Sequence, residues 1–223
     1  MAKKLYWKNP EDIEVLKELV KENNNVVISS TDTIYGFLAN VTRQAWETIC
    51  NIKEVAQKRP FLILVSQENK IDKLANFVDL AVLPEKTLQF IDACWPGPVT
   101  FIFKAKKDAP AFLSSDKGTV AIRCPEHKGL QEILRYFDGL FSTSANKSME
   151  PAPQKFTDIS QNILEKVSYI VLDDEDQERV AASTIVDLSV DMSGPDCAKE
   201  FPFTIIREGA FSVNKLKELY RNL

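Results

Sequence analysis

The chain alternates short apolar runs, typical of buried strands, with segments whose apolar residues recur at helical spacing. Strand-like runs occur at 26–28 and 61–65, and a helical stripe over 13–20 follows an Asn-Pro pair that can start a helix. This alternation predicts an α/β fold with helices packed on a sheet. The gaps between strand-like runs near 101–123 and 183–207 are short, so part of the sheet must be antiparallel. We therefore expect an open, mixed sheet.

The remaining elements follow from the same patterns. Helices are expected after Thr42, which can cap one, over 84–94, 130–137 and 157–167, and from Ser212 onward. Strands are expected at 99–104, 119–123, 140–143, 169–172, 183–188 and 203–207. With 223 residues and no internal repeat or long linker, we interpret residues 1–223 as one domain.

Net charge, cysteine and histidine content, and the lack of targeting segments exclude several classes of protein. The net charge of −4 disfavours a bulk polyanion binder, so any basic region must be local. Four scattered cysteines without a CxxC pair favour reduced thiols over a disulfide framework, and a single histidine, His127, excludes multi-His metal sites. The start lacks the apolar core of a signal peptide, and no apolar run has membrane length. We expect a cytoplasmic protein without a membrane partner.

Small polar residues stand where several predicted strands end. In an open α/β sheet, ligands bind at strand ends, where loops line a crevice on a rigid scaffold. Segments SSTDTIYG, AIRCPEH and FSTSAN combine hydroxyls, an amide and an arginine, and IIREG adds another arginine. Such groups suit an acidic, phosphate-bearing ligand with a polar second substrate. Each segment also has a plainer interpretation, since Ser and Asn can cap a helix and lysines can complement a helix end.

The order of these segments resembles the YrdC-type domain of threonylcarbamoyl-AMP synthases. The likeness runs through STDTIYGF, WPGPVTFIF, VAIRCPEH, STSAN with PAP, STIVDL and IIREGAF, from about residue 10 to 215. It implies a twisted α/β sheet with a concave, positively charged cavity. It also implies synthesis of threonylcarbamoyl-AMP from L-threonine, bicarbonate and ATP, with release of pyrophosphate, for N6-threonylcarbamoyladenosine modification of tRNA. The chain is similar to the short form of the family.

The resemblance also implies roles for particular residues. Thr33, Arg123, Ser142 and Ser183 fall at threonine-binding positions, and the ATP-binding positions correspond to Lys53, Arg59, Thr119, Ser144, Asn146 and Arg207. Lys53 and Arg59 would stabilise charge in catalysis, with no covalent nucleophile. Mg²⁺ is expected as a cofactor that accompanies ATP, without metal ligands from the protein. Further partners implied are tRNA and the proteins that later transfer the threonylcarbamoyl group.

The sequence departs from the family pattern in some of its functional segments. The family has K-x-R-P here, but Val55 occupies the arginine position and Ala56 the proline position. A glycine that usually follows SAN is Met149. Losing one charge-assisted phosphate contact costs roughly 1.5–3 kcal/mol, or about ten- to a hundredfold in affinity. Two alternatives therefore stay open: a non-catalytic YrdC-like paralogue that binds RNA or nucleotide, and a related enzyme that uses carbamoyl phosphate.

Overall fold

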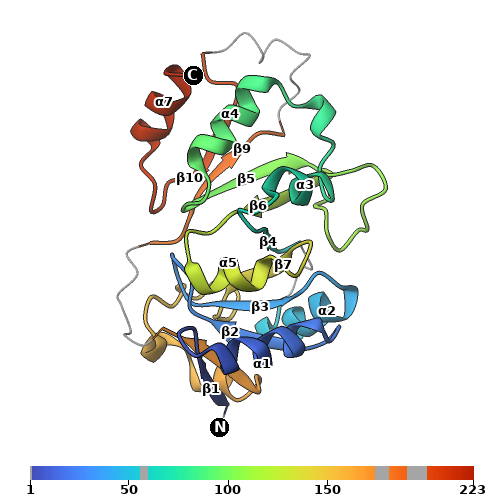
Figure 1. Cartoon of the computed structure of the whole chain (residues 1–223), viewed down its shortest axis with the longest axis vertical. Coiled ribbons are helices and arrows are strands. Elements are labelled where there is room, and N and C mark those ends of the chain that lie inside the picture. The colour runs from blue at the N-terminus through green and yellow to red at the C-terminus, as the bar shows by residue number, and fades with distance from the viewer. Residues whose placement is uncertain (1, 56–59, 174–180, 190–199) are drawn as a thin grey trace.

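The computed structural model describes residues 2–55, 60–173, 181–189 and 200–223 (Figure 1). The strands are β1 (Lys3–Tyr6), β2 (Val26–Ser29), β3 (Gly36–Asn40), β4 (Leu62–Leu64), β5 (Val99–Lys104), β6 (Thr119–Arg123), β7 (Leu140–Ser144), β8 (Tyr169–Leu172), β9 (Thr184–Asp187) and β10 (Thr204–Arg207). The helices are α1 (Pro10–Lys21), α2 (Arg43–Lys53), α3 (Lys70–Ala75), α4 (Glu85–Cys94), α5 (Lys128–Leu134), α6 (Gln161–Leu164) and α7 (Val213–Arg221), with short 3₁₀ turns η1 (Leu80–Val82) and η2 (Phe156–Asp158).

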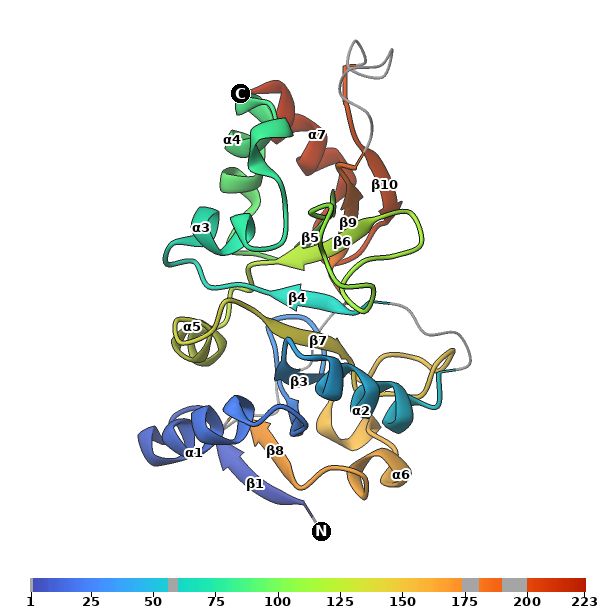
Figure 2. The same ribbon diagram turned by 90° about the vertical axis from the view of Figure 1, so that its right-hand side faces the viewer.

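The strands form one sheet in the order β1-β8-β2-β3-β7-β4-β6-β5-β9-β10. The pairs β1–β8, β2–β8, β4–β6 and β5–β9 are parallel, whereas β2–β3, β3–β7, β4–β7, β5–β6 and β9–β10 are antiparallel. The predicted mixed sheet is confirmed. In Figures 1 and 2 the sheet runs the length of the molecule and twists along it.

Alternate residues of the central strands serve two separate hydrophobic cores. In β2, Val26 and Ile28 belong to the larger core cluster, while Val27 belongs to the smaller one that contains residues of α1 and α5. Figure 2 shows α1 and α5 on one side of the sheet and α2 with α6 on the other. Because successive side chains of a strand point to opposite faces, one continuous apolar run supplies both cores. That explains why these strands read as unbroken apolar runs.

The predicted helix starts are present. The Asn9 side chain accepts a hydrogen bond from the Glu11 N–H, and the Thr42 hydroxyl accepts one from the Ala45 N–H. Both bonds satisfy backbone donors that a first helical turn leaves without partners. Helices α4 and α7 likewise begin at Glu85 and Val213, within a residue or two of the expected positions. No helix in the described parts of the chain has the length and apolarity of a membrane span.

Two local expectations need correction. Strand β3 was absent from the prediction, and the helix expected over 157–167 is divided into η2 and α6. The Asp158 carboxylate accepts hydrogen bonds from the N–H groups of Gln154 and Lys155 and so caps the start of η2. The chain then extends at Ile159, whose side chain is buried in the larger core.

Candidate functional site

A cavity of about 320 Å³ lies on the sheet face that also carries α1 and α5. Side chains of β6, β7 and β9 alternate there: Phe141 enters the larger core, whereas Ser142 and Ser144 line the cavity. In the same way Ile122 is in the core and Arg123 lines the cavity. The strand period therefore explains why the buried Phe141 is followed by Ser142 on the cavity side, and Thr143 also borders the cavity. The polar side chains stand on a rigid sheet.

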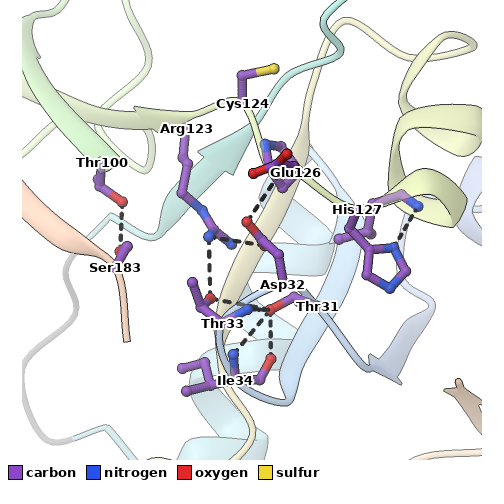
Figure 3. Close-up of polar contacts among 12 residues, drawn as sticks. Thr31, Asp32, Thr33, Ile34, Thr100, Arg123, Cys124, Glu126, His127 and Ser183 are labelled. Carbon is purple, nitrogen blue, oxygen red and sulfur yellow. Dashed lines mark hydrogen bonds and ion pairs between the residues drawn. The ribbon is translucent and has the colours of Figure 1, made fainter. Parts of the chain in front are cut away.

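Arg123 is the most deeply buried cation of the cavity, with 2% of its surface exposed. Its Nη1 atom donates a hydrogen bond of 3.2 Å to the Thr33 hydroxyl and lies 3.0 Å from the Asp32 carboxylate (Figure 3). Its Nε atom has no hydrogen-bond partner in the described part of the protein. A buried N–H donor without a partner is costly, so this guanidinium is prepared to bind an anionic or carbonyl group.

The turn between β2 and β3 places Thr33 beside this arginine. The Thr31 hydroxyl accepts hydrogen bonds from the N–H groups of Thr33 and Ile34, at 3.0 and 3.1 Å, and donates to the Ile34 carbonyl at 2.7 Å. Such hydroxyl-to-backbone bonds fold a tight turn. Thr31 thus shapes the turn, and Thr33 presents its hydroxyl to Arg123, as Figure 3 shows.

Ser183 and Arg207 form a second part of the cavity wall. The hydroxyls of Ser183 and Thr100 lie 2.8 Å apart, and the Ser183 carbonyl accepts bonds from Nε and Nη2 of Arg207, at 3.2 and 2.7 Å. Burial lowers the pKa of Arg207, and repulsion from Arg123 lowers it further. Two arginines that repel each other within one cavity, one buried and one partly exposed, favour an anionic ligand, because the ligand would offset both charges.

Lys53 lines the cavity, but its ammonium group already binds protein carbonyls. It donates to the Ser144 carbonyl at 2.5 Å and to the Asn146 carbonyl at 2.7 Å, and 6% of the residue is exposed. The neighbouring Glu54 forms ion pairs of 2.8 Å with Lys147 and Lys166. The end of α2 is therefore fastened to the loop after β7. Here Lys53 fixes the shape of the STSAN segment.

The structure brings together most of the residues predicted to bind the two substrates. The cavity lining includes Thr33, Lys53, Arg123, Ser142, Ser144, Ser183 and Arg207. Thr119 and Asn146 are not among its lining residues: the Thr119 hydroxyl lies 2.7 Å from that of Ser115, and the Asn146 amide donates to the Glu150 carbonyl. Arg59 falls outside the described residues. These binding roles stay predictions.

Asp32 and Thr100 are two site residues that the sequence did not single out. Asp32 lies between the two threonines of STDT, and its negative charge beside two polar residues could have marked it as a site residue. Thr100 lies in an apolar strand, where a lone hydroxyl gives little indication of function. The described lining contains cations and no carboxylate. The overall charge of the cavity stays a prediction, since 56–59 are not described.

The fold and the site define an α/β protein with a cavity suited to an anion, built on the face of an open mixed sheet. A profile of the Sua5/YciO/YrdC family, described as "Telomere recombination", matches residues 20–209. The chain belongs to this family.

Two relatives agree with this assignment. The chain is 31% identical over 217 residues to "Putative threonylcarbamoyl-AMP synthase" of Methanocaldococcus jannaschii, covering 96% of this chain and 95% of that protein. It is 28% identical to "Threonylcarbamoyl-AMP synthase" of Xylella fastidiosa, over 67% of this chain and 80% of the relative.

Among solved structures, the fold is similar to that of P. abyssi Sua5 complexed with L-threonine, with a TM-score of 0.80 and 21% identity. That match covers 98% of this chain and 60% of the P. abyssi protein, so this chain spans less than two thirds of it. E. coli YciO is similar over its whole length, with a TM-score of 0.76, 21% identity and 97% of this chain covered. At these identities the structures support the fold.

Proposed function

We propose that the protein is an L-threonylcarbamoyladenylate synthase. It takes L-threonine, bicarbonate or CO₂, and ATP, and forms threonylcarbamoyl-AMP and pyrophosphate. Family membership and the names of the relatives support this assignment. The structural observation that carries it is the placement of Arg123 and Arg207 on one cavity among short hydroxyl side chains. This arrangement suits a substrate carboxylate beside a polyphosphate.

Arg123 is the residue proposed to bind the threonine carboxylate. Its planar guanidinium matches a carboxylate in geometry, and its Nε donor lacks a protein partner. Thr33, Ser142 and Ser183 supply hydroxyls near it for the polar groups of the amino acid. Holding the amine in place favours its conversion to a carbamate by CO₂, because the encounter becomes local.

The phosphate chemistry is proposed to occur toward Arg207 and the STSAN segment. A carbamate oxygen attacks the α-phosphorus of ATP, the bond from that phosphorus to the bridging oxygen of pyrophosphate breaks, and pyrophosphate leaves with the electron pair. Arg207 offsets charge on the departing group, and Ser144 offers a small hydroxyl beside it. The described lining offers no carboxylate to hold Mg²⁺, so we expect the ion to enter with ATP.

The product is proposed to serve N6-threonylcarbamoyladenosine formation in tRNA, through separate proteins that transfer the threonylcarbamoyl group. We further propose the cytoplasm as the compartment. Cys50, Cys94 and Cys124 are all buried and form no disulfide, as expected in a reducing environment.

The decisive experiment incubates the purified protein with ATP, L-threonine, bicarbonate and Mg²⁺ and follows threonylcarbamoyl-AMP by mass spectrometry. We expect product that disappears when either threonine or bicarbonate is omitted, with pyrophosphate in equal amount and little product from serine. Arg207→Met should lower the rate about ten- to a hundredfold, the cost of one charge-assisted contact. Arg135→Met is the matched control, since Arg135 is paired with Glu68 at the exposed surface.

One observation favours a second candidate, a non-catalytic paralogue that binds nucleotide or RNA. Val55 lines the cavity where the family carries an arginine, and Lys53 is engaged by protein carbonyls. Absence of product from a folded protein that still binds ATP would favour this candidate. Salt-dependent binding of RNA would then be the next measurement.

A further inference from the structure

Asp32 is a buried carboxylate beside the cavity that the proposed chemistry does not use. Its side chain is 9% exposed, and its Oδ1 atom lies 3.0 Å from Nη1 of Arg123. Its Oδ2 atom accepts a hydrogen bond of 3.0 Å from the Glu126 N–H. Asp32 thus joins three segments: the turn between β2 and β3, the end of β6, and the loop that leads to α5 (Figure 3).

The contacts of Asp32 determine which part of the guanidinium remains available. Asp32 and the Thr33 hydroxyl both lie against Nη1 of Arg123. The Nε–H group lies on the opposite edge of the guanidinium from Nη1. It has no partner in the described part of the chain. A guanidinium is a rigid planar fork, so fixing one nitrogen fixes the direction of the others. Asp32 therefore sets the orientation in which the guanidinium lines the cavity.

The same ion pair makes the burial of Arg123 tolerable. Arg123 is 2% exposed and lies close enough to Arg207 to lower the pKa of that residue, so the cavity is lined by two cations that repel each other. A buried charge requires a counter-charge. Asp32 Oδ1 is close enough to supply it, but it has no aligned hydrogen bond in the described structure. The carboxylate thus holds the arginine by charge without occupying its remaining donors.

We propose that Asp32 is a positioning residue that holds Arg123 for the carboxylate of the amino-acid substrate. This inference rests on the proposed function for the identity of that substrate. Asp32 is not among the residues that line the cavity, so we expect it to touch neither the substrate nor the reacting atoms. Its removal should therefore weaken amino-acid binding more than it slows the chemical step.

The first test compares the wild type with Asp32→Asn, Arg123→Lys and the double variant in product formation and in L-threonine binding by calorimetry. Asparagine keeps an oxygen that can accept from the Glu126 N–H, while the charge is lost and the amide NH2, a donor, takes the place that faces Arg123. We expect the KM and Kd for threonine to rise about ten- to a hundredfold in Asp32→Asn, with a smaller change in kcat. Asp92→Asn is the matched control, because Asp92 forms an ion pair with Lys70 and is exposed.

The double variant separates positioning from a merely structural role. If Asp32 acts through Arg123, the double variant binds threonine no more weakly than Arg123→Lys alone. Multiplied losses would contradict the proposal. A lower Kd for threonine in Asp32→Asn would also overturn it, since Asp32 would then compete with the substrate for the arginine.

A second readout needs no substrate. NMR of the Arg123 Nε–H, assigned by its absence in Arg123→Lys, should show slow exchange with water in the wild type and exchange at least tenfold faster in Asp32→Asn. Equal exchange rates would refute the positioning role even if the enzyme is active. Failure of the wild type to bind threonine would instead refute the proposed function, while the exchange rates still decide whether Asp32 holds Arg123.

Discussion

Thr184 provides a quantitative test of how the wall of the cavity is held. The residue is fully buried at the start of β9, and its hydroxyl accepts hydrogen bonds from the N–H groups of Gly209 and Phe211, at 2.9 and 3.1 Å. The same hydroxyl donates to the Phe211 carbonyl at 2.5 Å. One side chain thus ties the segment after Arg207 to the strand that follows Ser183.

Thr184→Val keeps the shape of the side chain and removes all three hydrogen bonds. Each backbone group left without a partner costs about 1–3 kcal/mol when buried, and the low end applies because this segment is only partly buried. We expect the free energy of unfolding to fall by about 3 kcal/mol. With a urea m-value near 3 kcal/mol/M, which suits a large domain, the midpoint should fall by about 1 M.

Urea unfolding followed by circular dichroism measures this shift. Thr48→Val is the matched control: the Thr48 hydroxyl donates to the Gln44 carbonyl on the surface of α2, so its loss should stay within about 0.5 kcal/mol. A fall of less than about 0.3 M in Thr184→Val, with an unchanged m-value, would refute the reasoning, since the hydroxyl would not be the anchor described.

Three further predictions concern other parts of the structure. In Gly209→Ala, the added Cβ would lie 2.2 Å from the Ala182 carbonyl oxygen, so we expect a loss of about 1–3 kcal/mol in urea unfolding; an unchanged midpoint would contradict the packing. Burial raises the pKa of Cys94 to about 12 and that of Cys124 to about 11, so iodoacetamide at pH 8 should label the peptides containing these thiols only in denatured protein, and rapid labelling of native protein would count against burial. Hydrogen bonds from two lysines lower the pKa of Glu54 to about 2 from 4.5, so its stabilisation is complete above pH 4.5 and is lost as the pH falls toward 2; the difference in urea midpoint between wild type and Glu54→Gln should shrink over that range, and a constant difference would refute the assignment.

The sheet could be predicted because its signal is local. Apolar runs, helix caps and short gaps between strands each depend on a few neighbouring residues, and together they gave the mixed α/β class. The helix expected over 157–167 is interrupted where the backbone is extended at Ile159, whose side chain is buried in the larger core, and a helical pattern alone does not reveal this break. Strand β3 was missed although its pairing with both β2 and β7 places it in the centre of the sheet.

The sequence allowed us to predict which residues lie at the site, but it was less informative about what each of them does there. The order of the motifs predicted that Thr33, Arg123, Ser142 and Ser183 belong to one site. In the structure all four line the same cavity. Thr100, whose hydroxyl meets that of Ser183, lies in a strand with no polar pattern to mark it. Contacts of this kind join segments far apart in the chain, so they depend on tertiary packing that the sequence pattern does not contain.

Lys53 and Arg123 show why the type of a residue does not decide its role. Both are buried cations that line the cavity, and the sequence offered both as ligands for substrate charge. The Lys53 ammonium donates to the carbonyls of Ser144 and Asn146, so binding a phosphate would require it to share or release bonds that shape the loop. Within the described residues, Arg123 retains a buried donor without a partner, and a ligand that bonded to it would offset the cost of that burial. The state of its hydrogen bonds, more than its charge, therefore makes Arg123 the stronger candidate to bind substrate.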